Sequence, residues 1–181
     1  MKETGPNLSE KSTLLQKGTV APDFTLPTGA EKKVSLHDYK GKNVLLIFYP
    51  ADWSPVCGNE LTLFTEIHND FQKLNVQLLG ISVDNIWSHE AYTKSMNIPF
   101  PLLADFEPKG AVSKMYGAYN EQGFSSRALF LIDREGVIRW SYLSPLLEVP
   151  GMDEVLEQAE HLVATQTNHS KISESRQEHH V

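Results

Sequence analysis

The stretch from Asn43 to Leu61, NVLLIFYPADWSPVCGNEL, contains the only cysteine of the 181 residues and joins two kinds of pattern. Residues 43–49 form a continuous aliphatic and aromatic run, which is typical of a β-strand buried on both faces. Pro50 ends this strand, because proline cannot donate a hydrogen bond to a neighbouring strand. Between Gly58 and Leu74, hydrophobic residues recur every three or four positions, which predicts an amphipathic helix. Cys57 therefore lies between a buried strand and a helix.

The sequence beyond this stretch alternates between strand and helix patterns. A second buried strand is expected at 76–84, and the last two strands flank a glycine-containing turn, which predicts a β-hairpin. Such alternation indicates an α/β fold with a mixed sheet. The other expected elements are a helix at 86–96, an extended piece at 98–105, a short helix at 108–117, hairpin strands at 128–133 and 137–143, and a closing helix at 151–166.

Length and polarity predict one domain with two tails. The apolar patterns cover residues 15–166, which is enough chain to bury a sizeable core. Residues 1–14 and 167–181 are polar and offer few apolar groups to offset the entropy of ordering. We therefore expect a flexible N-terminal segment at 1–14 and a mobile C-terminal tail at 167–181.

Composition and charge disfavour several function classes. The net charge of -7 argues against nucleic acid and against anionic membrane surfaces as partners. The N-terminus lacks the apolar core of a secretory signal, and no apolar run is long enough to span a bilayer. A cytoplasmic protein that binds neither nucleic acid nor membrane is expected.

The cysteine count restricts the chemistry. A single cysteine cannot form an intramolecular disulfide, and it excludes metal centres that need several thiolates. The seven histidines show no metal-ligand spacing on a recognisable element, so neither a metal nor a cofactor is expected. Any redox reaction of Cys57 must therefore be completed by another molecule.

The surroundings of Cys57 favour a reactive thiol over a small buried hydrophobic residue. The amides at a helix start stabilise a thiolate, and the hydroxyl of Ser54, three positions earlier, can turn toward the sulfur. Pro50 can wall off a narrow, dry pocket beside the sulfur. The ordinary alternatives are a helix-capping role for Ser54 and a strand-terminating role for Pro50.

The motif Pro-x-x-x-Ser-x-x-Cys, formed by Pro50, Ser54 and Cys57 after a hydrophobic strand, resembles the active-site motif of the peroxiredoxins. The resemblance runs from about Gly18 to Leu143 and is greatest to the one-cysteine, alkyl hydroperoxide reductase E-like subgroup. It implies a thioredoxin-like fold, with a central mixed β-sheet flanked by helices. It also implies that Arg127, just before the strand ALFLID, approaches the Cys57 sulfur. Glu60 matches a carboxylate of this subgroup and is a supporting residue.

The resemblance further implies a thiol-dependent peroxidase. Cys57 would reduce hydrogen peroxide, organic hydroperoxides or peroxynitrite and become a sulfenic acid. An external thiol, such as thioredoxin, glutaredoxin with glutathione, or mycothiol, would then recycle it. A homodimer or a higher homo-oligomer is expected on the same basis.

Two other functions compete with this one. WSPVC has the outline of a Trp-Cys-x-x-Cys disulfide oxidoreductase, but Ser54 stands where such an enzyme needs its attacking cysteine. The second is a thioredoxin-like redox sensor or binding module that uses Cys57 without efficient peroxidase turnover. Slow reaction with peroxide would favour the sensor.

Overall fold

The strand predicted from the apolar run is the middle strand of the central sheet. The computed structural model describes the backbone of residues 13–177 and side chains as far as residue 170. Here β3 (Asn43–Phe48) is buried throughout and pairs with two neighbours of opposite direction. The sheet order is β5-β4-β3-β6-β7, parallel on one side of β3 and antiparallel on the other, so the expected mixed sheet is confirmed. The other strands are β4 (Val76–Ser82), β5 (Leu102–Ala104), β6 (Ala128–Ile132) and β7 (Ile138–Leu143).

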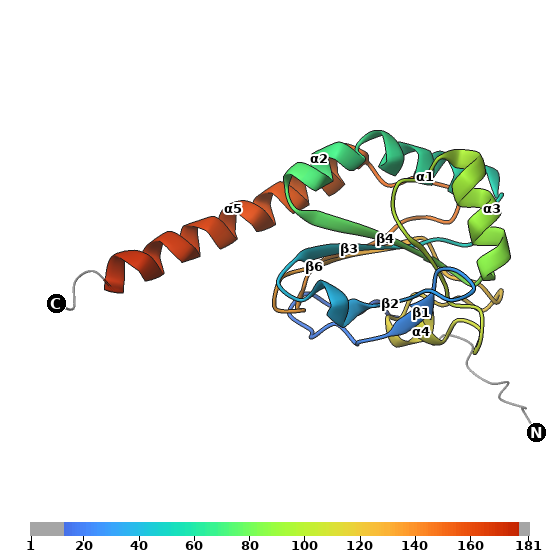
Figure 1. Cartoon of the computed structure of the whole chain (residues 1–181), viewed down its shortest axis with the longest axis horizontal. Coiled ribbons are helices and arrows are strands. Elements are labelled where there is room, and N and C mark those ends of the chain that lie inside the picture. Colours follow the sequence, from blue (N-terminus) through green and yellow to red (C-terminus); the bar gives the residue numbers. More distant parts are fainter. Residues whose placement is uncertain (1–12, 178–181) are drawn as a thin grey trace, which may run out of the picture.

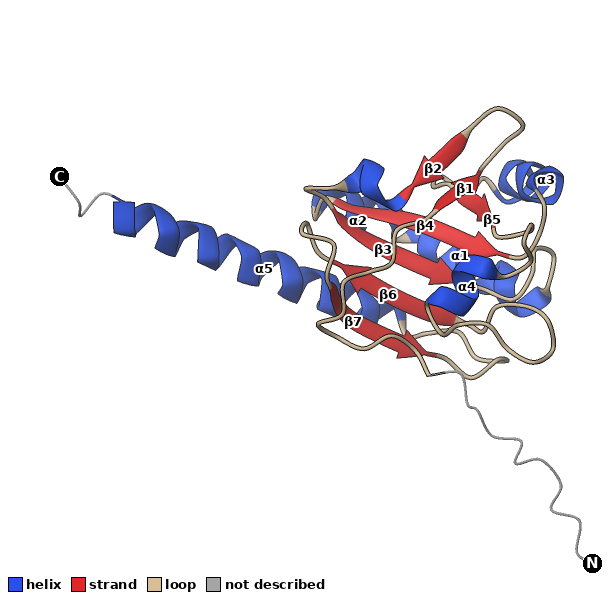
Figure 2. Cartoon of the chain, turned by 90° about the horizontal axis from the view of Figure 1, so that it is seen from below, coloured by secondary structure: helices blue, strands red, loops and turns tan. Residues whose placement is uncertain are grey.

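Helices cover both faces of this sheet (Figure 1). Alternate side chains of β3 point to opposite faces, and those of each face are buried in their own hydrophobic cluster. One face packs against α1 (Pro55–Glu66), α2 (His68–Lys73), α3 (Ile86–Met96) and the start of α5 (Met152–Gln177). The other face packs against α4 (Ala111–Met115), the small sheet of β1 (Thr25–Pro27) and β2 (Lys33–Ser35), and the 3-10 helix η1 (Leu36–Tyr39). Figure 2 shows the sheet from this second side.

Three predicted helices differ from the structure. The short helix expected at 108–117 is limited to α4, Ala111–Met115. The single helix expected through Leu74 is interrupted at Ile67, where α1 ends and α2 begins. The closing helix α5 continues beyond Gln166 to Gln177 and projects from the body of the molecule (Figure 1). Residues 167–177 are therefore helical, not irregular.

The remaining parts of the predicted tails lie outside the described residues, namely 1–12 and 178–181. At the N-terminal boundary, Leu14 is buried in the core, one residue before the predicted start of the domain. Along residues 13–177, no helix is both long and apolar enough to cross a membrane.

Candidate active site

The loop between β3 and α1 carries the predicted motif. Pro50 is buried where the strand ends, and Trp53 has a left-handed backbone conformation with φ of 63°. Ser54 then caps α1, whose first residue is Pro55, a favoured position for proline. The helix thus begins earlier than the apolar periodicity indicates, and Cys57 lies within its first turn instead of before it.

Ser54 both caps the helix and contacts the sulfur. Its Oγ accepts a hydrogen bond from the Cys57 amide at 3.3 Å and donates one to Cys57 Sγ at 3.1 Å. The two roles that the sequence offered for Ser54 therefore coexist. Cys57 thus lies in the first turn of α1, at the positive end of the helix dipole, where negative charge is stabilised.

Arg127 reaches the same sulfur from the neighbouring strand. Phe48, the last residue of β3, pairs with Ala128, the first residue of β6, so Arg127 lies just before β6 at the end of the sheet where the motif loop leaves β3. Arg127 Nη2 is 3.4 Å from Cys57 Sγ, and both Nε and Nη2 donate to the carbonyl oxygen of Leu146. The approach of Arg127 to Cys57, implied by the resemblance, is confirmed.

Glu60 completes a buried charged group. It lies one turn after Cys57 in α1, forms an ion pair with Arg127 Nη1, and is fully buried. Burial raises the pKa of Glu60 to about 7, although Arg127 opposes the shift. Burial also disfavours the charge of Arg127, but Glu60 and the Cys57 thiol outweigh it, so the pKa of Arg127 lies above its ordinary value. Glu60 Oε1 has no hydrogen-bond partner among the described residues.

An open hollow of about 390 Å³ leads to Arg127. It is lined partly by Leu143 and Leu146, and Leu147 beside it is 80% exposed. Cys57 itself is buried, while Trp53 on the motif loop is 56% exposed. Besides Leu143 and Leu146, the hollow is lined by the polar residues Asn120, Glu121, Gln122, Ser126 and Ser144, so a mainly polar approach leads to the buried Arg127.

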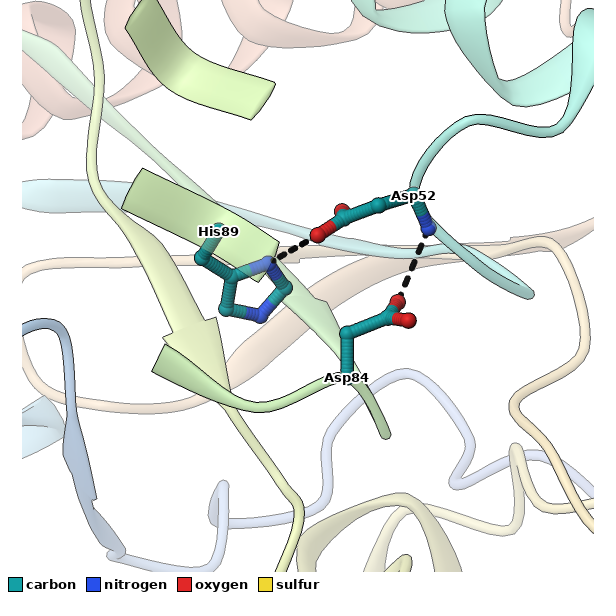
Figure 3. A group of neighbouring side chains, drawn as sticks. All are labelled: Asp52, Asp84 and His89. Atoms are coloured by element: carbon teal, nitrogen blue, oxygen red, sulfur yellow. Dashed lines mark hydrogen bonds and ion pairs between the residues drawn. The ribbon is translucent and has the colours of Figure 1, made fainter. Parts of the chain in front are cut away.

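Sequence reasoning missed a second polar group behind the loop. This group consists of Asp52, Asp84 and His89 (Figure 3). A carboxylate oxygen of each aspartate and a ring nitrogen of His89 lie within 4.8 Å of one another. Both ring nitrogens of His89 face hydrogen-bond acceptors, the Asp52 carboxylate and the Leu103 carbonyl. The group is therefore a hydrogen-bond network. A sequence signal existed, since Asp52 and Asp84 follow adjacent parallel strands, whose carboxyl ends meet at one edge of the sheet.

Comparison with protein families gives an independent result. The AhpC/TSA family model matches residues 17–141, which contain every residue of the motif as well as Arg127. The chain is 38% identical to peroxiredoxin 2 of Thermoplasma acidophilum over 146 residues, which are 77% of this chain and 72% of the relative. It is 39% identical to alkyl hydroperoxide reductase E of Mycobacterium bovis over 138 residues, 75% of this chain and 90% of the relative.

Solved structures agree with the fold. The crystal structure of reduced Plasmodium vivax 2-Cys peroxiredoxin matches with a TM-score of 0.75 and 30% identity, covering 86% of this chain and 83% of that one. Mycobacterium tuberculosis AhpC matches with a TM-score of 0.74 and 25% identity, covering 83% and 94%. The family model, the related sequences and the shared thioredoxin-like fold agree, and the single cysteine is consistent with a one-cysteine mechanism. The chain therefore belongs to the AhpC/TSA family of peroxiredoxins and is a thiol-dependent peroxidase.

Proposed function

We propose that Cys57 is the attacking residue of this peroxidase, and that Arg127 and Ser54 assist it. One observation carries the proposal: Sγ lies 3.1 Å from the Ser54 hydroxyl and 3.4 Å from the Arg127 guanidinium, in the first turn of a helix. Two donors and a helix start directed at one sulfur favour its anion, which is the nucleophilic form. The substrates are hydrogen peroxide, organic hydroperoxides or peroxynitrite.

The reaction is an in-line displacement at oxygen. The Cys57 thiolate forms a bond to one peroxide oxygen, and the O–O bond breaks with its electron pair on the other oxygen. With hydrogen peroxide or an organic hydroperoxide, that oxygen takes up a proton and leaves as water or as an alcohol. With peroxynitrous acid, the thiolate takes the hydroxyl oxygen, and nitrite leaves as an anion without taking up a proton. Cys57 has then become a sulfenic acid, oxidised by two electrons.

The neighbouring residues have distinct parts in this step. Arg127 and Ser54 donate to the oxygen that gains charge as the O–O bond lengthens, and such stabilisation is a large term in catalysis. Glu60 orients Arg127 through their ion pair. Pro50, buried at the end of β3, forms a wall without an N–H donor of its own.

An external thiol completes the cycle. With one cysteine in the chain, no internal disulfide can form, so a second thiol attacks the sulfenic acid and releases water. A further thiol then releases Cys57 from the mixed disulfide. Thioredoxin, glutaredoxin with glutathione, and mycothiol are candidate reductants.

We propose a homodimer or a higher homo-oligomer in the cytoplasm. Three exposed apolar side chains support the assembly, namely Leu143, Leu147 and Trp53, because exposed apolar groups favour burial against a partner. Light scattering that finds only a monomer of 20.4 kDa at micromolar concentration would contradict it.

The decisive experiment treats the reduced protein with one equivalent of peroxide and follows it by mass spectrometry. We expect rapid addition of one oxygen at Cys57, trapped by a sulfenic-acid reagent, and none in Cys57→Ser. Continuous peroxide consumption should begin only when an external thiol is added. Rapid oxidation without turnover by any thiol would favour the redox sensor. A covalent dimer as the only product would mean that Cys57 of a second chain, and not an external thiol, attacks the sulfenic acid.

A further inference from the structure

The motif loop is held in place by a buried carboxylate. The side chain of Asp52, in the loop between β3 and α1, is fully buried. Its two oxygens accept hydrogen bonds from the hydroxyls of Tyr49 and Ser88, each at 2.7 Å, and one of them lies 2.9 Å from His89 Nδ1. The loop is therefore tied to α3, which supplies both Ser88 and His89.

The hydrogen bonds of His89 define its protonation state. Nε2 is 3.1 Å from the Leu103 carbonyl oxygen, which can only accept, so this nitrogen carries a proton. Nδ1 is 2.9 Å from Asp52 Oδ2 and 3.4 Å from the Tyr49 hydroxyl, whose single proton goes to Asp52 Oδ1. Because Asp52 already accepts from two hydroxyls, it acts as an acceptor here too and Nδ1 is the donor. His89 is then an imidazolium that bridges β5 and the motif loop, and its side chain is only 1% exposed.

The same loop residue is fixed through its backbone. The amide of Asp52 donates to Asp84 Oδ2 at 2.8 Å (Figure 3), and the Ser82 hydroxyl donates to the same oxygen at 2.5 Å. The next residue, Trp53, has a φ of 63°, a left-handed conformation that is unfavourable for a residue with a side chain and persists only when its surroundings impose it. Ser54 follows directly, with its hydroxyl on the Cys57 sulfur.

We propose that His89, with a proton on each ring nitrogen and paired with Asp52, is a positioning residue for the peroxidase reaction. It does not contact the sulfur. It fixes Asp52, which holds Trp53 in its left-handed conformation and so places the Ser54 hydroxyl at hydrogen-bond distance from Cys57. This inference rests on the proposed function, because it concerns the same sulfur.

Two isosteric variants separate the His89 contacts. In His89→Asn the amide nitrogen lies near the position of Nδ1 and still donates to Asp52, whereas in His89→Gln it lies near that of Nε2 and donates to Leu103 instead. Both variants remove the charge. We expect oxidation of Cys57 by hydrogen peroxide to slow about tenfold in H89Q and less than about threefold in H89N. His161→Gln, on the exposed surface of α5, is the matched control and should react at the wild-type rate.

A double-mutant cycle tests whether His89 acts through Ser54. Ser54→Ala removes the hydroxyl that His89 is proposed to place, so H89Q should cause no further loss in the S54A background. An equal loss in both backgrounds, or an H89N variant as slow as H89Q, would overturn the proposal. If H89Q is unfolded at the assay temperature by circular dichroism, Asp52→Asn provides the same cycle from the other member of the pair.

A spectroscopic measurement separates this inference from the proposed function. In protein labelled with ¹⁵N-histidine, the His89 signals are identified by their loss in H89N. Both ring nitrogens should show the shifts of a protonated imidazolium at neutral pH, and a neutral ring would overturn the inference. This result does not depend on peroxidase activity, so wild-type protein that is inert to peroxide while its His89 is an imidazolium would contradict the proposed function alone.

Discussion

The hairpin of β6 and β7 carries two arginine–carboxylate pairs at its opposite ends. Arg127, just before β6, pairs with Glu60, and their side chains are 1% and 0% exposed. Arg139 in β7 pairs with Asp133 at 2.5 Å, and their side chains are 44% and 2% exposed. The hairpin therefore carries one arginine–carboxylate pair that is buried from solvent and one whose arginine is partly exposed.

The carboxylates in the two pairs differ in how well they are satisfied. Asp133 also accepts hydrogen bonds from the amides of Glu135 and Val137, which close the hairpin turn. Glu60 has one oxygen without a partner among the described residues, and burial raises its pKa. A buried ion pair often contributes less stability than well-packed apolar groups. We infer that the buried pair serves the chemistry at Cys57 and that the exposed pair serves the turn.

The largest expected effect is on the rate of peroxide attack. Arg127→Ala alone would leave the Glu60 carboxylate buried without its cation, so the comparison is made in an E60Q background. There, E60Q/R127A should oxidise about 10² to 10³ times more slowly than E60Q, because the developing negative charge loses its donor. Arg139→Ala should react at the wild-type rate. The comparison fails if the two arginine variants lose activity equally in a stopped-flow peroxide assay.

The next effect is the pH dependence of stability. The pKa of Glu60 rises from 4.5 to about 7 on folding, so between these values the folded state binds more protons than the unfolded state. Wild type should therefore lose stability relative to Glu60→Gln as pH rises from 4.5 to 7, by about 1 to 3 kcal/mol in total. Urea unfolding at several pH values measures the gap. A gap that changes in favour of wild type would mean that pairing with Arg127 outweighs burial.

The sequence predicted the fold where one local pattern had one physical cause. The run before Pro50 predicted a strand buried on both faces, which β3 is, and the helix at 86–96 has the predicted bounds. The interruption at Ile67 was missed, because α1 and α2 bury the same face and the apolar spacing continues across the break. In the helical extension beyond Gln166, residues 167–170 are exposed, so no apolar pattern marked their helix.

The site was predictable only in part for a similar reason. Ser54 and Cys57 are one helical turn apart, so local geometry brings them together. The contact of Arg127 with Cys57 depends on the register of β3 with β6, and only the family resemblance indicated it. Asp52 and His89 meet through tertiary packing of α3 against the motif loop, which no periodicity encodes.

The smallest expected effect concerns the exposed pair. Arg139→Ala should lower the free energy of unfolding by about 1 kcal/mol or less, because water screens a half-exposed arginine and partly replaces it. Asp133→Ala should cost more, about 2 kcal/mol, since the Glu135 and Val137 amides also lose their acceptor. The loss in R139A should shrink in 1 M salt, whereas the D133A loss should largely persist, because amide hydrogen bonds depend little on screening. Urea unfolding of wild type, R139A and D133A at two salt concentrations checks all three statements. If R139A lowers the free energy of unfolding as much as D133A does, the ion pair and not the amide hydrogen bonds stabilises the turn. The two arginine–carboxylate pairs would then differ only in their effect on peroxidase activity.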